Sequence, residues 1–186
     1  MEQFEHTIIF ETGIDPNTVQ DLINRMSSAN FVNLYFSTDG GYMADMNILI
    51  DYLNYRYQIG TLRLYVDKYV CSAGTLLLLN YVGPIFISKG FYGFMFHMPY
   101  IDNFHDIGFL KPKDPVYKKG EQRILQLRNN SYVNNLKGLG LTTKQIKDIN
   151  ENKEVYIFVD EIHKLKKTFF TGVEEEVTQH YTTFKF

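Results

Sequence analysis

The sequence predicts an α/β protein whose sheet is largely parallel. Short apolar runs alternate along the chain with segments in which apolar residues recur every three or four positions. The first pattern is typical of strands, and the second of helices with one apolar face. Because strand and helix alternate repeatedly, we expect the helices to act as crossovers between parallel strands. The hydrophobic content of 45% over 186 residues is enough for the core of one domain.

The amino-terminal half is expected to contain three strands and three helices. Asp15 and Pro16 mark the first helix start, because Asp is a favourable N-cap and Pro is tolerated in the first turn. A second helix follows Gly41, with its apolar residues at helical spacing. A third, buried helix begins at Ser72 and runs through Leu79. The expected strands lie at residues 7–10, 32–36 and 62–66.

The carboxy-terminal half is expected to add shorter elements. Thr142 is a suitable N-cap for a short helix through Ile149. A long helix with an apolar stripe is expected over residues 120–136. The remaining expectations are strands at 84–87, 94–96 and 155–158, an irregular stretch at 100–115, a helical turn at 160–166, and a polar tail from Thr168 with an acidic run at 174–176. We interpret residues 1–166 as the domain and 167–186 as its carboxy-terminal extension.

Composition and charge narrow the function classes. The net charge is −2 and the isoelectric point is near 6.2, so there is no electrostatic reason to expect a nucleic acid or an anionic membrane as partner. The single cysteine excludes an intramolecular disulfide, and no apolar run is long enough for a transmembrane helix. The first residues lack a basic region before an apolar core, so we expect no secretory signal and a cytoplasmic protein. The histidines show no metal-ligand spacing, and we expect neither a metal nor a cofactor.

Ser72 and His97 are the residues that most strongly indicate an activity. Ser72 stands at a junction from strand to helix, and His97 at the end of an apolar stretch. Gly40 and Gly41 end an earlier strand. A serine nucleophile, a histidine base and glycine N–H groups that can bind an oxyanion are the parts of a serine hydrolase.

Each of these residues also has a simpler interpretation. A serine before an apolar run is commonly a helix cap, a histidine on an apolar strand is commonly a core residue, and a pair of glycines can be a turn alone. Cys71, next to Ser72, is better interpreted as a small hydrophobic residue than as a nucleophile.

Three motifs in order give the chain a resemblance to a known family. Residues 37–41 read Ser-Thr-Asp-Gly-Gly, residues 71–74 read Cys-Ser-Ala-Gly, and residues 97–99 read His-Met-Pro. They resemble the Ser-Pro-Gly-Gly, Ala-Ser-Met-Gly and His-Gln-Pro motifs of the Clp protease proteolytic subunit, within the ClpP/crotonase superfamily. The spacing of 25 positions between serine and histidine is that of the family, and the resemblance covers roughly residues 7–165.

The resemblance implies specific roles for residues of this chain. Ser72 corresponds to the nucleophile, His97 to the general base, and the backbone N–H groups of Gly41 and Ala73 to the oxyanion hole. It implies repeated β-β-α units with a protruding long helix, which we place at residues 120–136. It also implies a homo-oligomer, a peptide or unfolded protein as substrate, and an AAA+ unfoldase as a candidate partner.

The third member of the catalytic triad is open at the level of sequence. The family has an aspartate just before a strand, and an ungapped alignment places Lys153 there, which cannot orient an imidazole. A shift of one residue places Glu154 at that position, and we prefer this carboxylate. Asp148 and Asn152 are the nearby alternatives.

Three functions follow from these observations. The first is a serine peptidase of the Clp type, and the second is an inactive homologue that serves as a binding or assembly partner. The third is an acyl-CoA enzyme of the crotonase type, which uses the same oxyanion hole but needs no Ser-His pair. The joint presence of Ser72 and His97 argues against the third.

Overall fold

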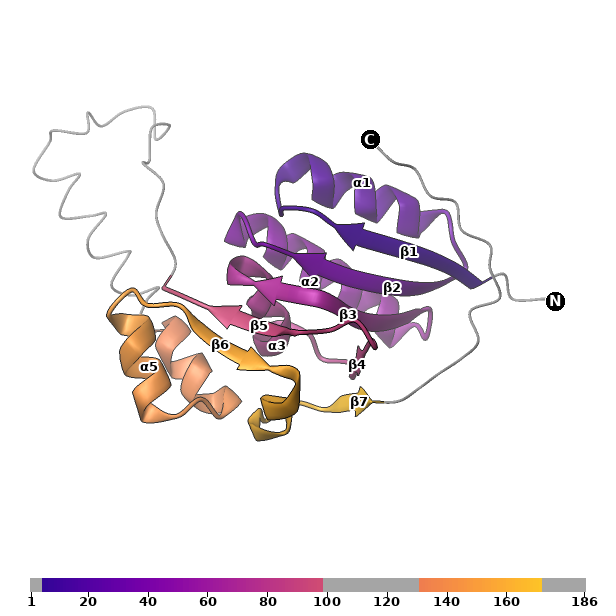
Figure 1. Cartoon of the computed structure of the whole chain (residues 1–186). Helices are drawn as coiled ribbons and strands as arrows, with labels where there is room; N and C mark the ends of the chain where they lie inside the picture. The colour runs from indigo at the N-terminus through magenta and orange to yellow at the C-terminus, as the bar shows by residue number, and fades with distance from the viewer. Residues whose placement is uncertain (1–4, 99–130, 172–186) are drawn as a thin grey trace, which may run out of the picture.

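The computed structural model describes residues 5–98 and 131–171, and its strands form one seven-stranded sheet (Figure 1). The strands are β1 (Glu5–Glu11), β2 (Phe31–Thr38), β3 (Leu62–Cys71), β4 (Ile85–Ile87), β5 (Gly93–Phe96), β6 (Val155–Phe158) and β7 (Phe169–Thr171). The helices are α1 (Pro16–Ser27), α2 (Met43–Gln58), η1 (Ser72–Thr75), α3 (Leu76–Asn80), α5 (Thr143–Asn150) and η2 (Val159–Lys164), together with a helical segment over 131–139.

The sheet confirms the predicted fold class. Strands run in the order β1-β2-β3-β4-β7, while β5 pairs with β3 and with β6. Among the described strands, the pairing of β5 with β6 is antiparallel and the other pairings are parallel. The carboxyl ends of β1, β2, β3 and β5 therefore lie along the same edge of the sheet.

Strand β3 changes partner along its length. Tyr65 and Val66 pair with β4, whereas Tyr69 to Cys71 pair with β5. Between these two parts, the register with β2 shifts and Lys68 has a left-handed φ of 48°. Such a bulge bends a strand and is common beside active sites. Beyond the bend, the last residues of β3 pair with β5 directly before the turn at Ser72.

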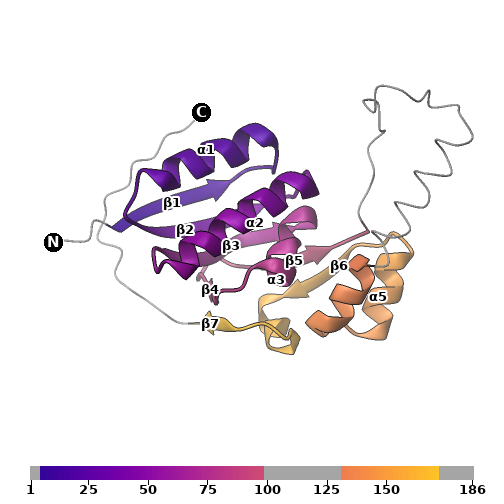
Figure 2. The ribbon, with the colours of Figure 1, turned by 180° about the vertical axis from the view of Figure 1, so that it is seen from behind.

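Helices α1, α2 and α3 cover one face of the sheet, as the view from behind shows (Figure 2). Their apolar residues at helical spacing are buried in the core, including Leu22, Met26 and Leu49. Helix α1 begins as predicted, since Asp15 Oδ1 accepts hydrogen bonds from the N–H groups of its first turn. This burial of one helix face fixes which side of each strand faces inward.

The opposite face of the sheet is turned to the viewer in Figure 1. Aromatic rings from neighbouring strands form a row along the sheet. Tyr35 and Tyr65 stack at 4.6 Å between ring centroids, and Phe86 lies 5.2 Å from Tyr65. Phe170 of β7 extends the row at 5.2 Å from Phe86. Cross-strand ring pairs of this kind stabilise the sheet and fix its register.

Five sequence-based expectations need adjustment or lie wholly or partly outside the described residues. Strand β3 continues to Cys71, well beyond the predicted end at residue 66, and the tail predicted to be polar begins with strand β7. Of the predicted long helix at 120–136, only residues 131–136 are described, and there Tyr132 and Leu136 are buried in the chain's own core. The predicted irregular stretch and acidic run lie outside the described residues.

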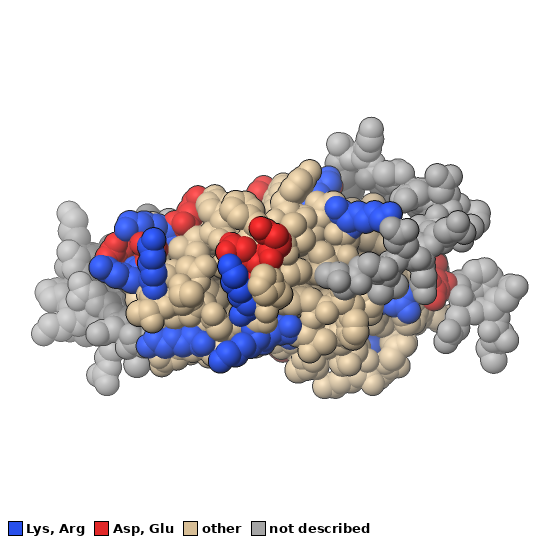
Figure 3. Space-filling model, turned by 60° about the horizontal axis from the view of Figure 1, so that its bottom comes forward, with Lys and Arg blue, Asp and Glu red and all other residues tan. Residues whose placement is uncertain are grey.

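The surface of the described residues carries both signs of charge. In the space-filling view, acidic side chains lie beside basic ones in several places, and broad uncharged areas lie between these mixed groups (Figure 3). A search of the described helices for a long apolar span found none that could cross a membrane.

Candidate active site

Ser72 occupies a tight turn between β3 and η1. Its backbone φ is 53°, in the left-handed region that residues with a side chain rarely adopt. Holding a residue in such a conformation costs on the order of 1–3 kcal/mol and is found most often at functional sites. The turn presents a half-buried hydroxyl at the carboxyl edge of the sheet.

Buried polar contacts hold this turn in place. Thr75 Oγ1 donates a hydrogen bond to the Ser72 carbonyl oxygen at 2.7 Å, and Thr75 is fully buried. Burial raises the pKa of Tyr132, while its hydrogen bond with Thr75 acts in the opposite direction. The helical segment 131–139 thus supports the turn, although it is distant in sequence.

His97 lies against Ser72. Its Nε2 is 2.7 Å from Ser72 Oγ, and its Nδ1 is 2.7 Å from the carbonyl oxygen of Met98. A carbonyl oxygen can only accept, so in the neutral imidazole the proton belongs on Nδ1. Nε2 is then the acceptor for the serine hydroxyl, which is the tautomer that a general base requires.

The two glycines after β2 approach this pair closely. Gly40 and Gly41 have φ values of 111° and 144°. A Cβ on Gly40 would lie 2.4 Å from Ser72 Cβ, and one on Gly41 would lie 2.0 Å from the carbonyl oxygen of Ile14. Both positions therefore require glycine for its space as well as for its backbone conformation.

The predicted oxyanion-hole donors belong to two segments that meet at Ser72, the glycine pair after β2 and the turn after β3. Ile14 N–H donates to Gly40 O at 2.7 Å and Tyr42 N–H donates to Ile14 O at 2.9 Å. In this parallel bridge the N–H of Gly41 points away from Ile14. Ala73 is in the first turn of η1, where N–H groups have no partner within the helix. Two such donors could bind a developing negative charge.

Glu154 is next to His97 in the strand register. Phe96, the last residue of β5, pairs with Val155, the first residue of β6. Continuing this antiparallel register by one position beyond the two strands places His97 opposite Glu154. Facing residues of antiparallel strands lie on the same side of the sheet. The Glu154 carboxylate accepts a hydrogen bond from the Tyr156 hydroxyl at 2.6 Å.

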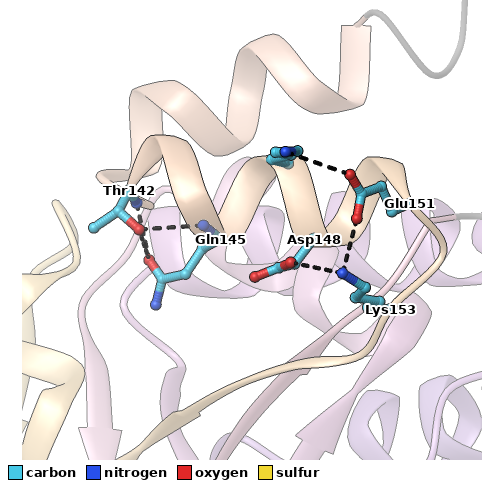
Figure 4. A network of polar contacts seen from close by, with 6 residues as sticks. Thr142, Gln145, Asp148, Glu151 and Lys153 are labelled. Atoms are coloured by element: carbon cyan, nitrogen blue, oxygen red, sulfur yellow. Dashed lines mark hydrogen bonds and ion pairs between the residues drawn. The ribbon is translucent and has the colours of Figure 1, made fainter.

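The alternative third residues are placed differently. Asp148, on α5, accepts a hydrogen bond from Lys153 Nζ at 3.2 Å, and the same ammonium group binds Glu151 at 2.8 Å (Figure 4). Asn152 is in the turn from α5 to β6 with a φ of 59°.

The pKa of the Cys71 thiol is affected by burial and by charges around the site. Burial is the main cause that raises the pKa of its thiol to about 11, and the negative charges of Asp39 and Glu154 contribute. The thiol is therefore protonated at neutral pH and is a poor nucleophile, in line with the sequence-based interpretation. Both carboxylates are close enough to act on the residue preceding Ser72.

Two contacts of the site were not anticipated from the sequence. The Met98 carbonyl as partner of Nδ1 is a backbone group, which leaves no signature in side-chain identity. The contact of Tyr156 with Glu154 could have been inferred, because residues two positions apart in an extended segment lie on the same face.

Comparison with solved structures places the fold in a known group. Structural matches include 343 chains, among them a point mutant of ClpP1 from Listeria monocytogenes. That structure superposes with a TM-score of 0.59 at 14% sequence identity, over 90% of this chain and 92% of the other. No family model and no curated protein matches the sequence. The chain has a ClpP-like fold, and the similarity is one of structure.

Substitution of Gly40 tests the geometry of the site. Gly40→Ala should reduce labelling of Ser72 by a fluorophosphonate at least about tenfold, because the new methyl group would displace the serine side chain. Gly138→Ala is the matched control, since a Cβ there meets no atom within 4 Å. Labelling of Gly40→Ala at the wild-type rate would show that the close approach is not needed.

Proposed function

We propose that this protein is a serine peptidase of the Clp proteolytic-subunit type, which cleaves peptides or unfolded protein segments. The observation that carries the proposal is the 2.7 Å contact between Ser72 Oγ and His97 Nε2 on a ClpP-like fold. The left-handed turn at Ser72 and the glycine packed closely against it add support, because strained backbone held in place by its surroundings is found most often at functional sites.

The reaction would proceed through an acyl-enzyme. Ser72 Oγ attacks the peptide carbonyl carbon while its proton passes to Nε2 of His97. The carbonyl oxygen becomes an oxyanion bound by the N–H groups of Gly41 and Ala73. When the C–N bond breaks, His97 gives its proton to the leaving amine. Water, deprotonated by His97 in turn, then hydrolyses the ester to release the acid and restore Ser72.

We assign the third role to Glu154. A carboxylate near the imidazole stabilises the positive charge that His97 carries after it takes the serine proton. Glu154 is favoured by its position opposite His97 in the β5–β6 register. Asp148 is engaged by Lys153, and Asn152 carries no charge.

An inactive homologue that acts as a binding or assembly partner is the second candidate. It is favoured by one observation, the pairing of Nδ1 with a neutral carbonyl while the Glu154 carboxylate binds Tyr156. An acyl-CoA enzyme of the crotonase type would leave the Ser72–His97 contact without a use.

The family resemblance extends the proposal to the setting of the protein. We propose a cytoplasmic homo-oligomer, with an AAA+ unfoldase as the candidate partner that delivers unfolded chains. The net charge of −2 gives no support to a nucleic-acid or membrane partner.

The nucleophile is tested by Ser72→Ala. We expect hydrolysis of a fluorogenic peptide to fall at least about 10³-fold and fluorophosphonate labelling to disappear, with the thermal unfolding midpoint preserved. Equal labelling of wild type and variant would refute the assignment. An unlabelled wild type with a folded structure would instead support the inactive homologue.

The acid is tested by a pair of isosteric substitutions. Glu154→Gln should lower kcat while leaving the fold intact, whereas Asp148→Asn should be nearly silent. In another serine protease, the corresponding change from acid to amide costs about 10⁴ in kcat; we expect a smaller loss here because Glu154 is exposed. The reverse ranking of the two variants would assign the role to Asp148.

Assembly is tested by light scattering. A homo-oligomer should give a molar mass several times the 21.8 kDa of the chain at micromolar concentration. A monodisperse species of monomer mass would contradict the proposed assembly without affecting the assignment of Ser72.

A further inference from the structure

Tyr156 contacts the proposed acid directly. Glu154 directly precedes β6, and Tyr156 follows it by two positions in the same extended segment, so their side chains lie on the same face. The tyrosine hydroxyl donates to Glu154 Oε2 at 2.6 Å, the short distance expected when the acceptor is charged. Tyr156 also pairs with Met95 across β5–β6, and Met95 pairs with Cys71. Tyr156 therefore lies in the same cross-strand row as Cys71, the residue that precedes Ser72.

The surroundings leave Glu154 dependent on this hydroxyl. Glu154 is exposed, and a free glutamate side chain would sample many rotamers in water. The neighbouring cation, Lys153, is held on the α5 side by Asp148 and Glu151, as the close view shows (Figure 4). The Tyr156 ring is itself steadied by Phe158, with centroids 6.1 Å apart and ring planes 11° from parallel.

We propose that Tyr156 is a positioning residue that keeps the Glu154 carboxylate beside His97. Its hydroxyl occupies one carboxylate oxygen and leaves the other available toward the imidazole. This inference rests on the proposed peptidase function, because the carboxylate matters only when His97 gains a proton.

The phenol keeps its proton in this setting. Its hydrogen bond to Glu154 is the main cause that raises the pKa of Tyr156, and desolvation and the negative charge of Glu154 act in the same direction. The hydroxyl is thus a donor throughout the neutral range, and the carboxylate is its natural acceptor.

The first test is Tyr156→Phe, which removes the hydroxyl and retains the ring. We expect kcat to fall about fivefold to thirtyfold, less than the full size associated with a hydrogen bond to a charged group because Tyr156 is exposed to solvent, with KM nearly unchanged. Tyr92→Phe is the control, because Tyr92 is also exposed to solvent and precedes β5 by one residue. An unchanged kcat, or a change confined to KM, would overturn the proposal.

A double-mutant cycle tests whether Tyr156 acts through Glu154. In a Glu154→Gln background, Tyr156→Phe should have little further effect on kcat, because the group that it positions has been removed. Independent, multiplicative effects of the two substitutions would overturn the proposal.

The contact between Tyr156 and Glu154 can also be tested without measuring enzymatic activity. In ¹³C spectra of labelled tyrosine, the Tyr156 ring should ionise at lower pH in Glu154→Gln than in wild type, because the carboxylate that raises its pKa is gone. An unchanged ionisation would overturn the inferred contact. The wild type could instead show the expected ionisation of Tyr156 but neither fluorophosphonate labelling nor peptide hydrolysis. That result would refute the peptidase function, and the positioning role with it.

Discussion

The close approach of Gly40 to Ser72 is the constraint on which the site depends. The Cα of Gly40 lies so near the serine that an added Cβ would fall 2.4 Å from Ser72 Cβ. The segment that contains Gly40 and Gly41 is held by a parallel bridge between Ile14 and Gly41. The chain segments that follow β1, β2 and β3 are thus locked together at one edge of the sheet. Parallel strands make this arrangement possible, because their carboxyl ends all reach the same edge.

The strand register then connects Ser72 to His97 and Glu154. The bulge in β3 at Lys68 frees its last residues to pair with β5, and β5 ends just before His97. The antiparallel partner β6 adds Glu154 at the position facing the histidine. Backbone pairing, which is rigid, therefore sets the distance between Ser72 and His97, whereas the exposed Glu154 needs a further contact from a side chain.

The parts of this structure that follow from local chemistry were predictable from sequence. The cap at Asp15, the succession of strands up to β6 and the pairing of Ser72 with His97 all rest on short motifs and periodicity. The extent of β3 was not predictable, because Asp67 and Lys68 interrupt its apolar pattern at the bulge. Strand β7 was missed since three residues in a polar region carry little periodic signal. The partner of Nδ1 depends on backbone geometry alone.

The pairing of His97 with Met98 separates two functions that an acid performs in a triad. A carbonyl acceptor at 2.7 Å from Nδ1 is sufficient to select the tautomer and to orient the ring. It carries no net charge, so it stabilises an imidazolium less than a carboxylate does. In the proposed peptidase that electrostatic contribution is assigned to Glu154, whose exposure places it in a medium of high dielectric constant. A peptide lying across this edge would exclude water from Glu154 and Tyr156 and strengthen their effect on His97. Substrate binding would then supply part of the preorganisation that the free site lacks.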